Sequence, residues 1–574
     1  SGYETVRERF IGLYRNENNP EAVELDRLSN QDTDFSNAIG ALKFEIELQP
    51  GEKKEIVINL GIIAKTEFSD KKKSVVERFQ NVENVAQSFV AVKQSWEKIL
   101  SSVKVTTPDR NTNIFLNYWT PYQARVAFDI GRVASFYYWG ISRGFGFRDT
   151  AQDVLAVSIS DPEKARERIL LLARQMFSSG RVFHHFYKDG QGETTRHCDD
   201  PLWFIFAVTE YLKETGDMEI VNRVEPFVDQ KSGTILDHLK AVLQFVKNNL
   251  GAHHLPVFGR GDWNDTLDYI GGDDGGESVW GGMFYVVMLN DLIELLSVLQ
   301  ETITRQEAEK LCNMIRDSIN KNCWDGDWFI RAFGDNGKKI GSKSNKYGKI
   351  FLNPQAWAVL GNVAEKGKLQ KAMASARHHL DTEFGPKICV PAFREIDPAI
   401  GLVTRCVAGK KENGAVFYHP TTWAIQAECL LGHGDIAYQY YRKLLPNSID
   451  SDRFQTEPYV YPQYITSDEH PTAGMASHSW QTGTAAWMYR VAIDYMLGVR
   501  ATYQGLLIDP VIPSHWPEFS MERIYRGTRY MIHVVNPDHV ERGIKEIVVD
   551  GRKVKTAVLA ISNRKICSVD VVMG

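Results

Sequence analysis

The stretch SDPEKARERILLLARQMF, residues 160–177, carries the pattern that decides the fold. Ser160 and Asp161 can cap the start of a helix, and Pro162 suits the first helical position because an N–H there would have no partner within the helix. The apolar residues that follow recur at the spacing of one helical face: Ile169, Leu172, Ala173 and Phe177. We therefore predict an amphipathic helix that begins at residue 162.

Helical patterns of this kind extend in both directions, over about residues 111–497. We count about twelve candidate helices in this region and almost no convincing strand, a run too long for a simple bundle. Twelve helices in pairs indicate an (α/α)6 toroid, in which the connecting loops meet at one end around a central cavity. The long loops are rich in glycine and aromatic residues, so we expect the functional site among them.

Other patterns flank this helical region. Apolar and polar residues alternate over 42–48 and 56–60, on either side of Pro50-Gly51, which predicts a β-hairpin. Over about 71–100 the apolar spacing becomes helical, which indicates a helical linker. After about Arg500 strand-like alternation returns with turn signals, which predicts a small β domain.

The composition is that of a soluble globular protein of several domains. The sequence has 574 residues, of which 43% are hydrophobic and 24% charged, and a net charge of −5. It lacks the basic balance of proteins that bind nucleic acid or anionic membranes. Seven cysteines without a C-x-x-C pair argue against a disulfide framework or a zinc site, and the apolar run 279–289 is short enough to be a core helix. We expect a cytoplasmic protein without a bound metal.

One loop, residues 259–268, combines the groups that glycosyl transfer needs. Asp262, Asp265 and Asp268 offer carboxylic acids that could protonate a leaving oxygen, and Trp263 offers a flat apolar face for a sugar ring. An alternative interpretation is a capped turn in which an aspartate binds backbone amides. Three further loops offer cations, hydroxyls and glycine amides that suit anions and sugars, although each alone is more often a plain polar loop: 143–149, 410–419 and 477–484.

Five motifs, taken in order, resemble those of one family. They are RGFGFRDTAQD (143–153), DDPLW (199–203), DWND (262–265), KENG (411–414) and TGTAAW (482–487). The sequence closely resembles the disaccharide phosphorylases of glycoside hydrolase family 94, which include cellobiose and chitobiose phosphorylases. The resemblance extends from near Gly2 to the C-terminus.

The resemblance implies a multidomain, mainly α protein. Residues 1–65 would be the C-terminal part of an N-terminal β-sandwich, 66–105 a helical linker, 106–499 an (α/α)6 barrel catalytic domain and 500–574 a C-terminal β domain. This order agrees with the periodicity. Family members begin well upstream of Ser1, so we expect most of the sandwich to lie outside this sequence. The resemblance also implies a homodimer.

The resemblance further implies the chemistry. Asp265 would be the general acid that protonates the glycosidic oxygen, while inorganic phosphate attacks the anomeric carbon from the opposite face and inverts β to α. Phosphate is already a competent nucleophile, so neither a second catalytic carboxylate nor a cofactor is needed. The positions that match the family's phosphate ligands are Arg132, His419, Thr482 and Gly483. Those that match ligands of the sugar whose bond is broken are Arg143, Asp149, Trp263 and Gln463.

The residues expected around the leaving sugar allow more than one substrate. Leu402 stands where cellobiose phosphorylases have a glutamate, as in the chitobiose type, but the long insertion of chitobiose enzymes is absent between residues 186 and 199. Arg405 and Lys411, together with Lys410, could bind an acidic leaving sugar such as an aldonate, or could be solvated surface charges. We predict a β-glucosyl disaccharide phosphorylase with a cellobiose-like substrate, which releases α-glucose 1-phosphate. The alternative is an N,N'-diacetylchitobiose phosphorylase, which releases N-acetyl-α-glucosamine 1-phosphate.

Two other classes of protein remain as rivals. An inverting hydrolase on the same barrel could use Glu412 as the base that activates water. A carbohydrate-binding or regulatory module without catalysis is the second. Phosphate dependence of turnover separates the hydrolase from a phosphorylase, and any turnover excludes the module.

Overall fold

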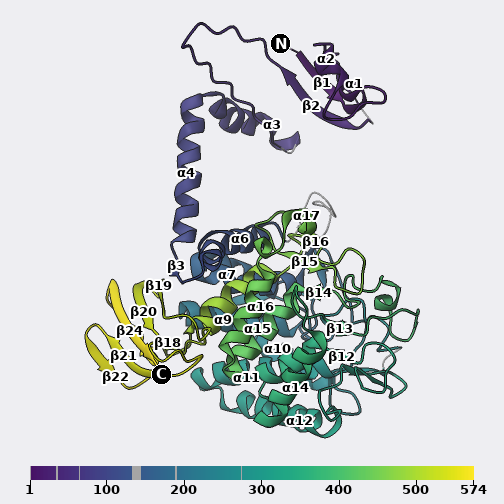
Figure 1. Cartoon of the computed structure of the whole chain (residues 1–574), viewed down its shortest axis with the longest axis vertical. Coiled ribbons are helices and arrows are strands. Elements are labelled where there is room, and N and C mark those ends of the chain that lie inside the picture. Colours follow the sequence, from purple (N-terminus) through teal and green to yellow (C-terminus); the bar gives the residue numbers. More distant parts are fainter. Residues whose placement is uncertain are drawn as a thin grey trace. The chain divides into compact units, whose positions relative to one another are not determined.

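The computed structural model describes residues 2–33, 36–61, 63, 65–131, 144–187, 190–272 and 275–574 (Figure 1). The chain divides into two units, Ser1–Ser95 and Trp96–Gly574.

The first unit contains an antiparallel pair of strands, β1 (Gly2–Val6) and β2 (Ala38–Lys43). The helices α1 (Arg7–Ile11) and α2 (Glu21–Glu24) lie between these strands in the sequence. Farther along, α3 (Phe68–Lys71) and short turns of π and 3-10 helix precede α4 (Val82–Leu100). The helical pattern that begins near residue 71 is thus confirmed.

The predicted β-hairpin is wrong in its strands. The turn at Pro50-Gly51 forms, but residues 44–60 contain no strand. Their alternating apolar side chains are exposed, by 45% for Phe44 and 63% for Ile58. A two-stranded ribbon needs another layer to cover its apolar face, and the described residues of this unit do not provide that layer here.

The second unit is built mainly of helices. The helix α8 (Pro162–Ala173) begins at the predicted residue, where Pro162 takes the first position and the Asp161 side chain accepts a hydrogen bond from the Lys164 amide. The described part of the unit has eleven further helices of seven or more residues: α6 (Thr120–Ile130), α7 (Phe147–Ser160), α9 (Leu202–Thr215), α10 (Ile235–Asn248), α11 (Val279–Val298), α12 (Thr302–Asn322), α13 (Leu352–Leu360), α14 (Lys366–Leu380), α15 (Tyr418–Leu431), α16 (Gly434–Leu444) and α18 (Thr484–Arg490). Two helices are shorter, α5 (Arg110–Ile114) and α17 (Ser451–Phe454).

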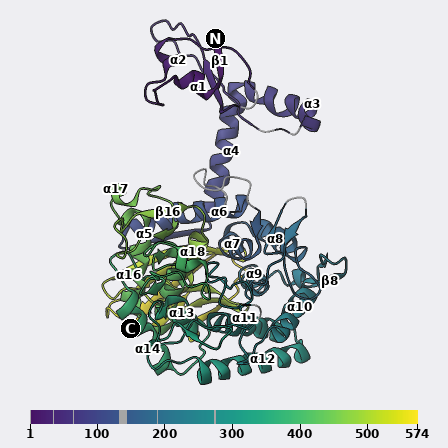
Figure 2. The same cartoon turned by 90° about the vertical axis from the view of Figure 1, so that its right-hand side faces the viewer.

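Six of these helices pack in a closed cycle. The order of contact is α7, α9, α11, α13, α15 and α18, and α18 packs back against α7 (Figures 1 and 2). The remaining long helices each pack against members of this cycle: α6, α8, α10, α12, α14 and α16. Five tryptophans, each from a different helix of the cycle, meet with ring centroids 5.2–6.5 Å apart: Trp203, Trp280, Trp357, Trp423 and Trp487. This buried aromatic layer holds the cycle together, because stacked and edge-on rings combine large apolar burial with specific geometry.

The helix α11 is long and apolar enough to cross a membrane by length and composition alone. Its side chains are instead largely buried against α9, α12 and α13. The prediction of a core helix over residues 279–289 is therefore confirmed.

Short strands in the connections of this unit were not predicted. They are two to four residues long and pair locally: β4 (Phe145–Gly146), β5 (His185–Phe186), β6 (Gly192–Glu193), β7 (Val224–Pro226), β8 (Ser232–Thr234), β9 (Glu277–Ser278), β10 (Ala332–Phe333), β11 (Lys339–Ile340), β12 (Ile350–Phe351), β13 (Cys389–Val390), β14 (Val416–Phe417), β15 (Pro462–Ile465) and β16 (Ala476–Ser479). Such pairs are too short to produce a periodic signal in the sequence. They fix the ends of the loops that precede several helices.

The last part of the chain forms two sheets. One has the order β17 (Val499–Ala501), β18 (Gly505–Ile508) and β23 (Val558–Ala560). The other has six strands in the order β22 (Arg552–Val554), β21 (Ile544–Val549), β24 (Ile566–Met573), β20 (Thr528–Val535), β19 (Glu518–Tyr525) and β3 (Val103–Thr106). The alternation after residue 500 thus predicts the strands correctly.

The strand β3 corrects the predicted linker. Residues 103–105 belong to the predicted helical linker 66–105, but they form a strand that pairs antiparallel with β19. Val103 and Val105 are buried, whereas Lys104 between them is only partly covered. This two-residue period suits the edge of a half-buried sheet and not a helix.

Candidate active site

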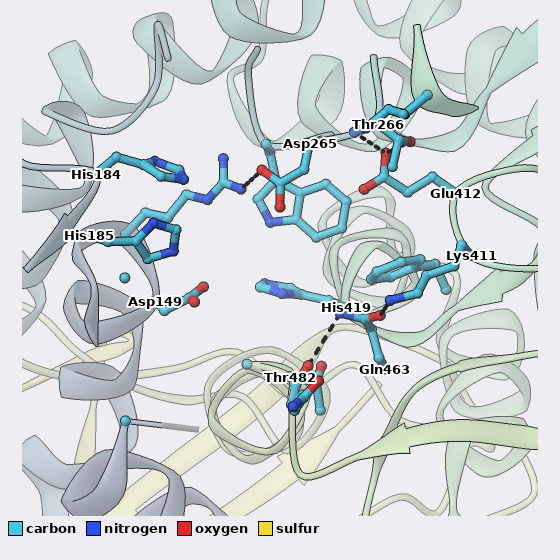
Figure 3. A pocket seen from close by; sticks show the side chains of 18 of the residues that line it. Asp149, His184, His185, Asp265, Thr266, Lys411, Glu412, His419, Gln463 and Thr482 are labelled. Carbon is cyan, nitrogen blue, oxygen red and sulfur yellow. Dashed lines mark hydrogen bonds and ion pairs between the residues drawn. The ribbon is translucent and has the colours of Figure 1, made fainter. Parts of the chain in front are cut away.

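A cavity of about 760 Å³ lies in the second unit at the N-terminal ends of α7, α15 and α18 (Figure 3). Ten of the predicted site residues line it: Asp149, Trp263, Asp265, Leu402, Arg405, Lys411, His419, Gln463, Thr482 and Gly483. Arg132 and Arg143 lie outside the described residues. The fold therefore brings these ten residues together from distant loops, while the role of each stays a prediction.

The carboxylates of the loop 259–268 have different tasks. Asp262 is fully buried, where it pairs with Arg331 (2.6 Å) and accepts a hydrogen bond from the Asn264 amide (2.9 Å). The alternative of a capped turn is therefore confirmed for Asp262. Asp265 instead has 56% of its side chain exposed and lines the cavity.

The backbone of this loop approaches the segment before α9 very closely. Gly259 has a φ of 62°, and a Cβ at this position would lie 2.1 Å from the carbonyl oxygen of Arg196. Only glycine tolerates both the left-handed backbone and this approach. The glycine therefore helps to set where Asp265 stands.

Burial and positive charge compete at Asp265. Arg148, in the first turn of α7, donates a hydrogen bond to its Oδ1, and His197 Nε2 lies 3.7 Å from the same oxygen. Removal of water raises the pKa of this carboxyl, but the charge of Arg148, joined by His197 and His184 when these rings are protonated, outweighs that effect and holds the pKa below its usual value. Without a ligand, Asp265 is a carboxylate at neutral pH.

Glu412 lies beside Asp265, and both carboxyls flank Thr266 (Figure 3). Its Oε2 accepts hydrogen bonds from the Thr266 hydroxyl (2.6 Å) and from Asn264 Nδ2 (3.1 Å). Burial and the negative charge of Asp265 raise the pKa of Glu412 to about 7, although these hydrogen bonds act in the other direction. Glu412 therefore holds a proton for part of the time at neutral pH.

The motif DDPLW has a local structural explanation. Asp200 accepts a hydrogen bond from His184 (2.8 Å), and Asp199 accepts one from the Trp203 indole (2.9 Å) while its Oδ2 lies 3.5 Å from Arg148. Burial lowers the pKa of His184, but the charge of Asp200 outweighs burial and raises it. The motif thus stabilises the wall of the cavity, because its two aspartates bind residues of that wall.

His184, His197 and Asp200 form a cluster whose potential donor atoms lie within 4.8 Å of one another. The two imidazoles stack with centroids 4.2 Å apart and planes only 10° from parallel. Parallel stacked rings do not direct their in-plane nitrogen lone pairs at one ion. The cluster favours hydrogen bonding, and the prediction that no metal is needed stays a prediction.

Three of the four predicted phosphate ligands, His419, Thr482 and Gly483, line this cavity. His419 is in the first turn of α15, 3% exposed, with its ring 5.2 Å from that of Trp263. The Thr482 hydroxyl lies 2.6 Å from that of Thr484, and Gly483 is the residue that precedes α18. Figure 3 shows Thr482 on the side of the cavity away from Asp265. An imidazole, a hydroxyl and backbone amides are groups that bind phosphate oxygens.

Two contacts fix residues predicted to bind sugars. Lys411 Nζ donates a hydrogen bond to Gln463 Oε1 (2.9 Å), which joins the KENG loop to β15. The Leu402 amide donates to Asp268 Oδ1 (2.8 Å), so the third aspartate of the loop 259–268 anchors the loop that carries Leu402.

Several residues of the cavity wall were not predicted, among them Arg148, His184, His185, Tyr187, Thr266 and Gln481. Arg148 lies within the first motif and Thr266 directly follows the motif DWND, so their places in the sequence were an available signal. His184 and His185 lie in none of the five motifs, and only the fold brings His184 to its partner Asp200.

The sequence was compared with models of protein families. A model described as the catalytic domain of the glycosyl hydrolase 94 superfamily matches residues 95–498. The chain belongs to glycoside hydrolase family 94. A model of the supersandwich domain of family 94 matches residues 1–82. The family inferred from the five motifs is confirmed, and so is a sandwich-type N-terminal part.

Relatives of this family 94 protein cover most of its length. The N,N'-diacetylchitobiose phosphorylase of Vibrio proteolyticus is 34% identical over 96% of this chain and 72% of its own. Solabiose phosphorylase of Paenibacillus borealis is 31% identical over 98% of this chain and 72% of its own. The 3-O-beta-D-glucopyranosyl-beta-D-glucuronide phosphorylase of the same organism is 32% identical over 94% and 70%. The prediction of an enzyme of the disaccharide phosphorylase type is confirmed.

Proposed function

We propose that this enzyme catalyses the inverting phosphorolysis of a β-linked disaccharide and releases α-D-glucose 1-phosphate and a monosaccharide. The observation that carries the proposal is that Asp265, His419 and Thr482 line one cavity. A proton donor and anion-binding groups can therefore act on the same glycosidic bond. The relatives named above are phosphorylases, which supports phosphate as the nucleophile. Inorganic phosphate is a substrate here, and no cofactor takes part.

The proposed reaction is a single displacement. Asp265 gives its proton to the glycosidic oxygen, which leaves with the electron pair of the broken bond as a sugar hydroxyl. A phosphate oxygen supplies the electron pair of the new bond at the anomeric carbon, from the opposite face. The proposed phosphate ligands are His419, Thr482, Gly483 and Arg132. The proposed ligands of the transferred sugar are Asp149, Trp263, Gln463 and Arg143, and Lys411 is a proposed ligand of the leaving sugar.

We further propose that the cycle of α7, α9, α11, α13, α15 and α18 is the inner ring of an (α/α)6 barrel. Its outer ring would be α6, α8, α10, α12, α14 and α16. The packing order of the helices supports this, and so does a cavity at the N-terminal ends of inner helices. A homodimer and a cytoplasmic location belong to the same proposal, on the basis of the family resemblance and the cysteine pattern.

The arrangement around Glu412 speaks against the hydrolase alternative. A base for water in an inverting hydrolase acts on the face of the sugar opposite the general acid. Glu412 instead lies beside Asp265, and its Oε2 already accepts hydrogen bonds from Thr266 and Asn264. It is better suited to hold the loop of Asp265 or to bind a sugar hydroxyl.

Glucosyl transfer is favoured over the N-acetylglucosaminyl alternative. The chitobiose-type insertion is absent between residues 186 and 199, where the described residues include β6, which pairs with β5. Leu402, which lines the cavity and is 48% exposed, is the feature that favours the alternative. Arg405 also lines the cavity, so an acidic leaving sugar belongs among the acceptors to be tested.

The test is product analysis with defined substrates. The full chain is incubated with inorganic phosphate and either cellobiose, cellobionate or N,N'-diacetylchitobiose, and the sugar phosphates are identified by ³¹P NMR. We expect α-glucose 1-phosphate from a β-glucosyl substrate. If a sugar phosphate forms only from N,N'-diacetylchitobiose, the transferred sugar is N-acetylglucosamine and not glucose. Release of free sugars without phosphate would favour the hydrolase.

A further inference from the structure

Arg148 holds the proposed general acid at more than one point. It is 7% exposed in the first turn of α7 and donates a hydrogen bond to Asp265 Oδ1. Its Nη1 donates to the backbone carbonyl of Asp262 (2.8 Å) and lies 3.5 Å from Asp199 Oδ2. One guanidinium therefore ties both the backbone and the side chain of the loop 259–268 to α7. A planar fork of fixed donors can do this, whereas the single ammonium of lysine cannot match the geometry.

Among the residues that the structure describes, charged and titratable groups from four segments act on Asp265. Arg148 comes from α7, His197 from the segment before α9, His184 from the segment before β5 and Glu412 from the loop before β14. Burial lowers the pKa of His197 to about 4, so this ring is neutral at neutral pH. Among these four groups, Arg148 carries the charge that persists at every working pH.

Resting on the proposed function, we propose that Arg148 is a positioning residue, which holds one oxygen of Asp265 and, through its charge, sets the pH range in which Asp265 carries the proton it donates. Figure 3 shows the Asp265 oxygen that is not bound to Arg148 turned toward the cavity, where a glycosidic oxygen would lie. The contact thus orients the acid without occupying the oxygen that reacts.

The positive charge of Arg148 affects phosphorolysis and the reverse reaction, synthesis, in different ways. Phosphorolysis needs the protonated acid, and Asp265 must regain a proton from solvent after it has given one to the leaving oxygen. Synthesis needs the carboxylate, which accepts a proton from the acceptor hydroxyl. Because Arg148 favours the carboxylate, phosphorolysis falls as the pH rises through the pKa of Asp265. A dianionic phosphate in the same cavity would raise that pKa and so favour proton uptake.

The experiment is the pH profile of kcat/KM for the disaccharide at saturating phosphate. It compares the wild type with Arg148→Gln and Arg148→Lys. We expect Arg148→Gln to raise the pH at which kcat/KM falls on the alkaline side by about 1 pH unit or more. A close arginine shifts the pKa of a carboxyl by about this amount. Arg148→Lys keeps the charge, so its profile should stay nearer to the wild type while kcat falls. The ionisation of phosphate itself is common to all variants and cancels in the comparison.

Folding is controlled with a paired variant. Arg148→Gln leaves the Asp199 carboxylate without its positively charged neighbour, so Arg148→Gln/Asp199→Asn removes both charges and should show the same upward shift. A reduced rate with an unchanged pH profile in both neutral variants would overturn the proposal, because a structural role alone predicts that result. If the wild type forms no sugar phosphate, the proposed function is what fails, and this is known before any variant is measured.

Discussion

Asp262 and Asp265 show at the residue scale how two identical side chains, three positions apart, take different tasks. Asp262 is buried against Arg331, whereas Asp265 stands in the cavity with its charge held by Arg148. The sequence does not distinguish them, because each aspartate could cap a turn and each could be the general acid. The environment makes the assignment, since only the exposed side chain can reach a substrate.

The variant Asp265→Asn should keep the fold and lose the proton donor. We expect phosphorolysis to fall by about 10²–10⁴-fold or more, because the amide cannot protonate the leaving oxygen. The measurements are kcat for sugar phosphate release and the melting temperature. Activity near that of the wild type would show that Asp265 is not the general acid.

The matched control at this scale is Asp262→Asn. It leaves the Arg331 guanidinium buried beside a neutral group, and breaking such a buried pair costs about 3–5 kcal/mol. We therefore expect a clear loss of stability in denaturant unfolding. An unchanged stability would contradict the structural task assigned to Asp262.

At the scale of elements, one loop and one helical turn position groups in the cavity. The loop 259–268 needs glycine where it passes Arg196, so Gly259→Ala should push it away from its neighbour. We expect a kcat loss of about 10²-fold, the size of effect that a displacement of about 1 Å can have on a reacting group. Gly337→Ala is the control, because a Cβ at Gly337, which also has a positive φ, meets nothing within 4 Å. Equal activity of the two variants would show that the close approach does not position Asp265.

The N-terminal turn of α15 is the second such element. His419→Ala should raise the KM for phosphate far more than the KM for the disaccharide, because the imidazole is a proposed phosphate ligand. Arsenate should replace phosphate in the wild type and yield free sugar, since the arsenate ester hydrolyses. Kinetics with each substrate varied in turn measure this, and an effect on the disaccharide alone would contradict the assignment.

At the scale of the whole second unit, buried ion pairs join the helices to the C-terminal sheet. Arg523 on β19 is fully buried and binds Glu214 on α9 (2.7 Å). Arg523→Met would leave Glu214 with Arg490 alone and would remove a buried partner of Asp494, so it should destabilise the chain by about 3–5 kcal/mol. Arg529→Met removes only the exposed pair with Glu522, for which about 0–1 kcal/mol is expected. Thermal unfolding compares the two, and equal effects would show that the buried pair does not hold the sheet to the helices.

The sequence predicts the helices well and the contacts between them poorly. The caps and the 3.6-residue period locate helices such as α8, since both signals are local. The prediction of strands over 42–48 and 56–60 fails for a physical reason. Alternating apolar and polar residues indicate that one face of a strand is apolar, but not that another layer covers this face. The motifs likewise locate Asp265 and His419, but the pairing of Arg148 with Asp265 joins residues 117 positions apart and becomes visible only in the fold.

The central claim is phosphate-dependent inversion at the anomeric carbon through Asp265. The most direct measurement follows the anomeric signals by ¹H NMR while wild type and Asp265→Asn act on a β-glucosyl disaccharide, with and without inorganic phosphate. We predict an α-configured glucose 1-phosphate as the first product of the wild type, only in the presence of phosphate, and almost none from the variant. A first product that is free glucose, or a β-phosphate, would contradict the account.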